Sequence, residues 1–166
     1  LALREVRWVR PEGVHLTLKF LGNIHPDAVE PVSRALGRCA ASSLPFELSL
    51  KDLGGFPSLG DPRVVWVSLR GGLEQLQSLQ AAVEREMELL GFARERRPFS
   101  PHLTLGRVRD GASTLQRRRM GEALAGAALE VSGDLPVREI SLVKSTLTPS
   151  GAVYARLFSA PLGRAS

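Results

Sequence analysis

The sequence is short of several residue types, and each shortage limits what the protein can be. Of its 166 residues, one is cysteine and three are histidine. The single cysteine, Cys39, forms no intramolecular disulfide and no cysteine-based metal site. Its setting among small apolar residues predicts a small buried side chain. This cysteine usage fits a reducing cytoplasm, where we expect the protein to act.

Long apolar runs are also missing. No segment approaches the roughly 20 apolar residues that span a bilayer, and no secretory signal pattern is visible, so we expect no membrane partner. Hydrophobic residues make up 43% of the chain and charged residues 23%, which is ordinary for a globular domain and argues against intrinsic disorder. The length predicts a single domain over residues 1–166, built as two lobes.

Lysine is scarce, and arginine supplies nearly all the positive charge. The chain has 22 Lys and Arg against 17 Asp and Glu, for a net charge of +5, and its only lysines are Lys19, Lys51 and Lys144. Arginine binds phosphate bidentately, so an anionic partner such as RNA or a nucleotide is favoured. Genome composition and solubility would give the same enrichment, and charge alone does not separate these explanations.

Two of the three histidines open the same tetrapeptide, His-Leu-Thr-Leu, at residues 15–18 and 102–105. A second copy would arise by chance on the order of once in a few thousand tries. Duplication, or one piece of chemistry that needs two equivalent strands, is a better explanation. In a strand, residues i and i+2 share a face, so each copy presents one His and one Thr while its leucines enter the core.

The hydrophobic periodicity predicts an α+β fold. Strands are expected at residues 7–9, 14–21, 44–53, 64–69, 102–108, 137–147 and 153–160, and helices at 26–41, 73–90 and 114–129. Each motif begins one half of similar element order. We therefore expect two pseudo-symmetric lobes, each a mainly antiparallel sheet with helices outside, and an active-site cleft between them.

Two imidazoles and two hydroxyls suit phosphoryl chemistry. Imidazoles titrate near neutrality, so one His can act as general base while the other acts as general acid. The threonine hydroxyls can hold phosphate oxygens where charge develops. The motifs need no metal and make a poor zinc site. The third histidine, His25, precedes Pro26 at a helix start and is expected at the surface.

Further segments extend the pattern beyond the two motifs. They are Arg7-Trp8, Pro11-Glu12, Gly55-Phe56-Pro57, residues 62–67, residues 97–107, Ser145, Leu147, Gly151 and Tyr154. With these, the sequence resembles the 2H phosphoesterase superfamily, and most closely its RNA 2′,3′-cyclic phosphodiesterases, also called 2′-5′ RNA ligases. Such proteins usually carry a strand and a helix before the Arg-Trp stretch. We expect these two elements to be missing here.

The resemblance implies a site and a reaction. His15 would be the proton donor and His102 the proton acceptor, while Thr17 and Thr104 would bind the phosphate. The reaction would be hydrolysis of an RNA 2′,3′-cyclic phosphate end to a 2′-phosphate, without metal or cofactor. A ribose 5′-hydroxyl in place of water would give 2′-5′ ligation. We expect a monomer acting in RNA processing, with tRNA fragments among its substrates.

Three further residues are expected near the substrate. Phe99 would stack a base or sugar, Arg107 would bind phosphate, and Lys19 would add positive charge at the rim. Strict alternation places Arg107 on the strand face opposite Thr104, so it reaches the site only if the strand twists or ends.

Two other functions stay open. One is a module that binds nucleotides or RNA ends without turnover. The other is a related enzyme acting on a small cyclic nucleotide or a cyclic ADP-ribose derivative. The arginine-rich composition leans toward RNA.

Overall fold

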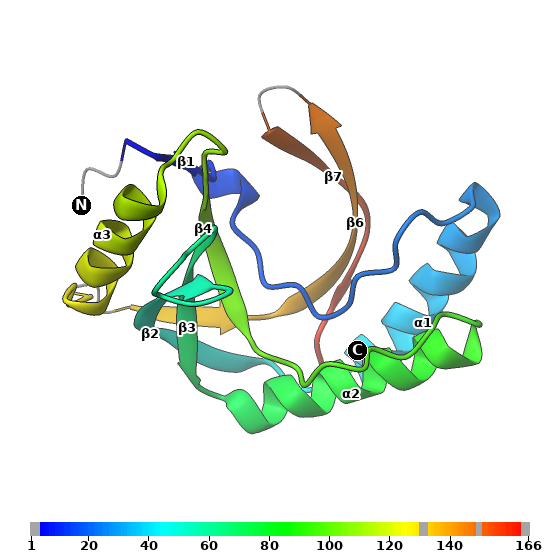
Figure 1. Cartoon of the computed structure of the whole chain (residues 1–166). Helices are drawn as coiled ribbons and strands as arrows, with labels where there is room; N and C mark the ends of the chain where they lie inside the picture. Colours follow the sequence, from blue (N-terminus) through cyan, green and yellow to red (C-terminus); the bar gives the residue numbers. More distant parts are fainter. Residues whose placement is uncertain (1–3, 130–132, 149–150, 164–166) are drawn as a thin grey trace. The chain divides into compact units, whose positions relative to one another are not determined.

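The computed structural model describes residues 4–129, 133–148 and 151–163 (Figure 1). Its helices within these ranges are α1 (Val29–Ala41), α2 (Leu73–Leu89) and α3 (Thr114–Ala125). Its strands there are β1 (Val6–Trp8), β2 (Phe46–Phe56), β3 (Val64–Gly71), β4 (His102–Val108), β5 (Asp134–Val137), β6 (Glu139–Thr148) and β7 (Gly151–Pro161). Short 3-10 turns occupy Pro11–Gly13 and Pro26–Ala28. The predicted α+β class is confirmed.

The chain forms two compact units whose segments alternate along the sequence. Unit 1 comprises residues 1–17, 49–71 and 101–134, and unit 2 comprises residues 18–48, 72–100 and 135–166. Both His-x-Thr stretches therefore belong to unit 1. The expectation of one motif per lobe is wrong, because the chain returns twice to unit 1 instead of finishing one lobe before starting the next.

Unit 1 is built around β4, which pairs in antiparallel fashion with β1 and β3. The sheet order is β1-β4-β3-β2-β5. Val6 of β1 and Val65 of β3 pack with Met120 and Leu124 of α3 in a buried cluster. One face of the sheet therefore packs against α3 and forms the core of the unit. The side chains that alternate with Val6 and Val65 point to the other face.

In unit 2, α1 packs against α2 and against the antiparallel hairpin β6–β7. The side chain of Arg38 on α1 donates a 2.6 Å hydrogen bond to Glu86 on α2. Cys39, on the buried face of α1, is 3% exposed, and burial raises the pKa of its thiol. The prediction of a buried cysteine is confirmed. Among the described residues, no helix is long and apolar enough to cross a membrane.

The predicted strand at residues 14–21 is wrong. Only Leu16 pairs, through a single antiparallel bridge with Leu103. The same edge of β4 is already occupied further along, because the Val9 amide donates to the Leu105 carbonyl and β1 pairs with residues 106–108. Phe20, which would share a strand face with Leu16 and Leu18, is 82% exposed.

Other boundaries differ by a few residues. The sequence pattern does not predict β5, whose four residues include a proline, which is unfavourable in a strand interior. α3 ends at Ala125, with Gly126 as its C-cap, instead of reaching residue 129. His25 lies at the surface as predicted, and its Nδ1 accepts a hydrogen bond from the Asp27 amide.

Candidate functional site

Residues 15–17 and 102–104 lie side by side within unit 1, joined by the bridge between Leu16 and Leu103. Directly opposed side chains share one face, and their neighbours along a strand point to the other face. The two leucines therefore lie on one face, and His102 and Thr104, which flank Leu103 in β4, point to the other.

The bridge joins the middle residues of the two His-x-Thr stretches, so both histidines lie in the same part of unit 1. Across the described part of the chain, no group of three or more His, Cys, Asp or Glu residues is placed to bind a metal ion.

The imidazole of His102 contacts two aromatic rings. It meets Phe56 edge-on, with ring centroids 5.0 Å apart, and lies 6.1 Å from Trp66. Phe56 and Trp66 also contact each other, at 5.1 Å. Gly54 makes room for this cluster, because a Cβ there would lie 2.3 Å from the indole. Sequence reasoning missed these neighbours, although the Gly-Gly-Phe-Pro run and the tryptophan were its signals.

His15 is exposed and anchored by its own turn. Its Nδ1 lies 2.7 Å from the carbonyl oxygen of Gly13, which closes the 3-10 turn at residues 11–13. A carbonyl oxygen only accepts hydrogen bonds, so Nδ1 carries the hydrogen. A contact of this kind fixes the tautomer and the orientation of a histidine ring.

A bulge interrupts the pairing of β4 with β3. Trp66 pairs with Thr104 and Val65 pairs with Gly106, so Leu105 is the extra residue on β4. Leu105 packs against the core cluster. Gly106 also points toward the core, where a Cβ would lie 2.4 Å from Val6. Two consecutive residues of β4 thus face the core, which shifts the alternation beyond them by one residue.

The bulge changes the predicted direction of Arg107. This residue pairs with Val64 of β3, two residues before Trp66, so Val64 and Trp66 share a face. Trp66 in turn shares a face with its partner Thr104. Arg107 therefore lies on the same face as Thr104, and strict alternation, which places it on the opposite face, is wrong here.

Lys19 serves an internal contact in unit 2. Its side chain is 5% exposed, and Nζ donates to Glu84 at 2.5 Å and to the Ala93 carbonyl at 2.8 Å. Burial alone would raise the pKa of Glu84, but the bonds from Lys19 and from the Glu95 amide, with nearby positive charge, lower it below its ordinary value. The charge of Lys19 is thus compensated, and its expected place at a substrate rim finds no support.

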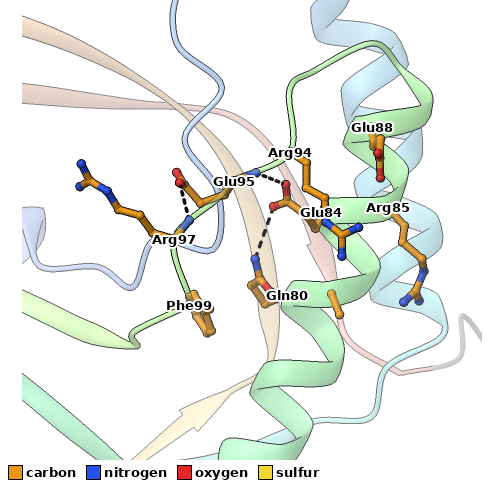
Figure 2. A pocket seen from close by; sticks show the side chains of 9 residues that line it. Gln80, Glu84, Arg85, Glu88, Arg94, Glu95, Arg97 and Phe99 are labelled. Carbon is orange, nitrogen blue, oxygen red and sulfur yellow. Dashed lines mark hydrogen bonds between the residues drawn. The ribbon is translucent and has the colours of Figure 1, made fainter.

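Phe99 is half-buried in unit 2 and lines a pocket of about 410 Å³ beside α2 (Figure 2). Arg85 and Arg94 line the same pocket, and so do Glu84 and Glu88. Opposite charges are mixed around this space, so it does not select for an anion. Stacking of a base on Phe99 stays a prediction.

Comparison with known proteins agrees with the motifs. Residues 4–148 match the family model of the 2′-5′ RNA ligase superfamily. The chain is 36% identical over 160 residues to the RNA 2′,3′-cyclic phosphodiesterase of Aeropyrum pernix, covering 92% of this chain and 84% of that protein. It is 38% identical over 157 residues to the protein of the same name from Thermus thermophilus, covering 90% and 72%.

Solved structures show the same fold. A crystal structure of a Thermus thermophilus protein superposes with a TM-score of 0.73 at 28% identity, covering 98% of this chain and 85% of that one. E. coli LigT complexed with 3′-AMP gives a TM-score of 0.73 at 26% identity, with coverage of 98% and 84%. The resemblance inferred from the sequence is confirmed, and the chain belongs to the 2′-5′ RNA ligase superfamily.

Proposed function

We propose that this protein hydrolyses the 2′,3′-cyclic phosphate at RNA ends and leaves a 2′-phosphate. The observation that supports the proposal is the bridge between Leu16 and Leu103, the middle residues of the two His-x-Thr stretches. Two relatives that share more than a third of its residues bear the name RNA 2′,3′-cyclic phosphodiesterase. A structural relative has been crystallised with 3′-AMP.

The reaction uses the two histidines as a complementary pair. His102 takes a proton from water as the water oxygen attacks phosphorus in line with the 3′ oxygen. The new P–O bond forms as the P–O3′ bond breaks, and His15 gives the proton on its Nε2 to the departing 3′ oxygen. One proton is taken and one is given, and the 2′ ester remains. Exchange with water then restores both imidazoles.

The remaining polar groups bind the phosphate. The hydroxyls of Thr17 and Thr104 donate hydrogen bonds to the non-bridging oxygens, where negative charge develops. Arg107 adds a positive charge from the same face of the sheet. None of these steps calls for a metal ion. Attack by a ribose 5′-hydroxyl in place of water, with the same P–O3′ bond broken, gives 2′-5′ ligation.

The alternatives differ in what they require of the histidines. A module that only binds RNA ends needs hydrogen-bond donors but no pair of titratable groups. An enzyme for small cyclic nucleotides needs both histidines but no contacts beyond one nucleotide. The paired His-x-Thr arrangement therefore favours turnover, and the arginines of unit 1 favour a longer anionic substrate.

The test is incubation with an oligoribonucleotide that ends in a 2′,3′-cyclic phosphate, with EDTA present. Wild type should open the ring, and His15→Ala and His102→Ala should each lower kcat by about 10²- to 10⁴-fold. The pH–rate profile should be bell-shaped, and each single variant should lose one limb. Full activity in either variant, or no ring opening by wild type, would contradict the proposal.

A further inference from the structure

Two arginines lie directly opposite each other on neighbouring strands of unit 1. Arg7 of β1 pairs with Arg107 of β4, and both side chains are exposed. Directly opposed side chains have Cβ atoms about 4.5–5.5 Å apart, and like charges in this position are destabilising. Within the described ranges, neither guanidinium donates a hydrogen bond or forms an ion pair. The sheet thus holds two positive charges together without compensation.

The arginine pair lies on the polar face of the motifs. The bulge at Leu105 turns Arg107 to the face of Thr104, and Arg7 shares that face because it is directly opposite Arg107. Val6, the neighbour of Arg7 along β1, points to the core, as alternation requires.

The distance from the motif threonine is short. On β3, the residue that pairs with Arg107 is two positions from the residue that pairs with Thr104. Two residues of a strand span about 7 Å. The arginine pair therefore lies about 7 Å along the sheet from Thr104, a distance that an arginine side chain can reach across.

We propose that Arg7 binds the phosphodiester group on the 5′ side of the terminal nucleotide, and so selects RNA ends over single cyclic nucleotides. This inference rests on the proposed function. A guanidinium binds a phosphate through two parallel hydrogen bonds. A phosphate beside Arg7 and Arg107 also removes the repulsion between their charges. A mononucleotide 2′,3′-cyclic phosphate has no second phosphate and gains nothing from Arg7.

The experiment compares three substrates at one ionic strength. They are a tetraribonucleotide ending in a 2′,3′-cyclic phosphate, the mononucleotide cyclic phosphate, and a tetranucleotide whose last internucleotide linkage is an uncharged methylphosphonate. Arg7→Gln should raise KM for the first about tenfold and change kcat by no more than about twofold. The other two substrates should be unaffected. Arg7→Lys keeps the charge but loses the two parallel donors of the guanidinium. Its KM for the tetraribonucleotide should therefore lie between those of wild type and Arg7→Gln.

Arg119→Gln is the matched control. It removes the same charge from the same unit, from an exposed position on α3. Its neighbour Met120 packs on the core face of the sheet, away from the motif face. Arg119→Gln should leave all three KM values unchanged. Arg7→Gln should not lower Tm, because it removes one member of a like-charged pair.

The results separate this inference from the proposed function. If Arg7→Gln changes KM equally for all three substrates or for none, or if Arg119→Gln has the same effect, the role of Arg7 is overturned. If wild type opens no ring, the proposed function fails. In that case, the affinity for a 3′-phosphorylated tetranucleotide, measured by fluorescence anisotropy, tests the role of Arg7. A Kd about tenfold weaker in Arg7→Gln supports the inference, and an unchanged Kd overturns it.

Discussion

Substitution of Gly54 by alanine should move the histidine of the second motif without touching it. A Cβ at Gly54 would lie 2.3, 2.4 and 2.7 Å from three atoms of the Trp66 indole, whereas ordinary contacts begin at 3.4 Å. The ring must therefore retreat by roughly 1 Å. Because Trp66 and Phe56 both contact the His102 imidazole, that displacement reaches the proposed general base.

The expected effect follows from these distances. Misplacement of a reacting group by about 1 Å can cost on the order of 10²-fold in rate, and overpacking of this kind costs about 1–3 kcal/mol of unfolding free energy. We expect Gly54→Ala to lower kcat on the cyclic phosphate oligonucleotide by about 10- to 100-fold at a temperature where the variant is fully folded. The assay is steady-state hydrolysis, with Tm measured by calorimetry on the same preparation.

A second glycine provides a matched control for Gly54→Ala, and a substitution of Trp66 should reverse part of its effect. Gly60→Ala adds the same methyl group where the nearest atom is 3.7 Å away, so its kcat should match wild type. Trp66→Phe in the Gly54→Ala background removes the clashing atoms and should recover part of kcat. The reasoning is refuted if Gly54→Ala is folded and turns over at the wild-type rate, or if Gly60→Ala is equally impaired.

Three other predictions concern stability and reactivity. The pKa of Glu84 is lowered in the folded protein, so its ionised form stabilises the fold above the unfolded pKa, and this contribution is lost as the pH falls through the folded pKa. The difference in urea unfolding free energy between wild type and Glu84→Gln should therefore shrink from pH 7 to about pH 3. A difference that stays constant with pH would contradict this prediction. Gly121→Ala places a Cβ 1.6 Å from the Leu59 carbonyl oxygen, so it should cost more than the roughly 1 kcal/mol gained in helix propensity and lower Tm, whereas Gly126→Ala, with its nearest atom at 3.6 Å, should not. Cys39, buried and with a raised thiol pKa, should react with a thiol reagent far more slowly in the native protein than in urea; equal rates would show that the helix does not shield it.

Much of the fold could be predicted because its elements are periodic. The helices α1 and α2 and the strand β4 carry regular apolar patterns, and the structure places them within a few residues of the expected bounds. Pairing could not be predicted in the same way. Residues 14–21 have the pattern of a strand, but the adjacent edge of β4 is shared with Val9 and β1, so only Leu16 finds a partner. Competition for one edge is a tertiary effect that a local pattern does not contain.

The candidate site, like the fold, could be predicted from the sequence only in part. The repeated His-x-Thr predicts that the two stretches act together, and the bridge between Leu16 and Leu103 brings them side by side, while their joint chemistry stays a prediction. The direction of Arg107 could not be predicted, since it depends on the bulge at Leu105, which is defined by the register between two strands. The glycine after the bulge was the only local hint. Phe56 and Trp66 were visible as residues, but their contact with His102 depends on the same register.

The alternation of the two units along the chain has a consequence for synthesis on the ribosome. Neither unit is one continuous segment, since each is assembled from three stretches separated by parts of the other. The first motif emerges early, but its partner Leu103 follows 87 residues later, and α3, which covers the core face of that sheet, later still. A nascent chain therefore cannot complete a unit and then begin the next. Each unit therefore gains its structure only after its third stretch has been synthesised, through long-range contacts that tend to form slowly.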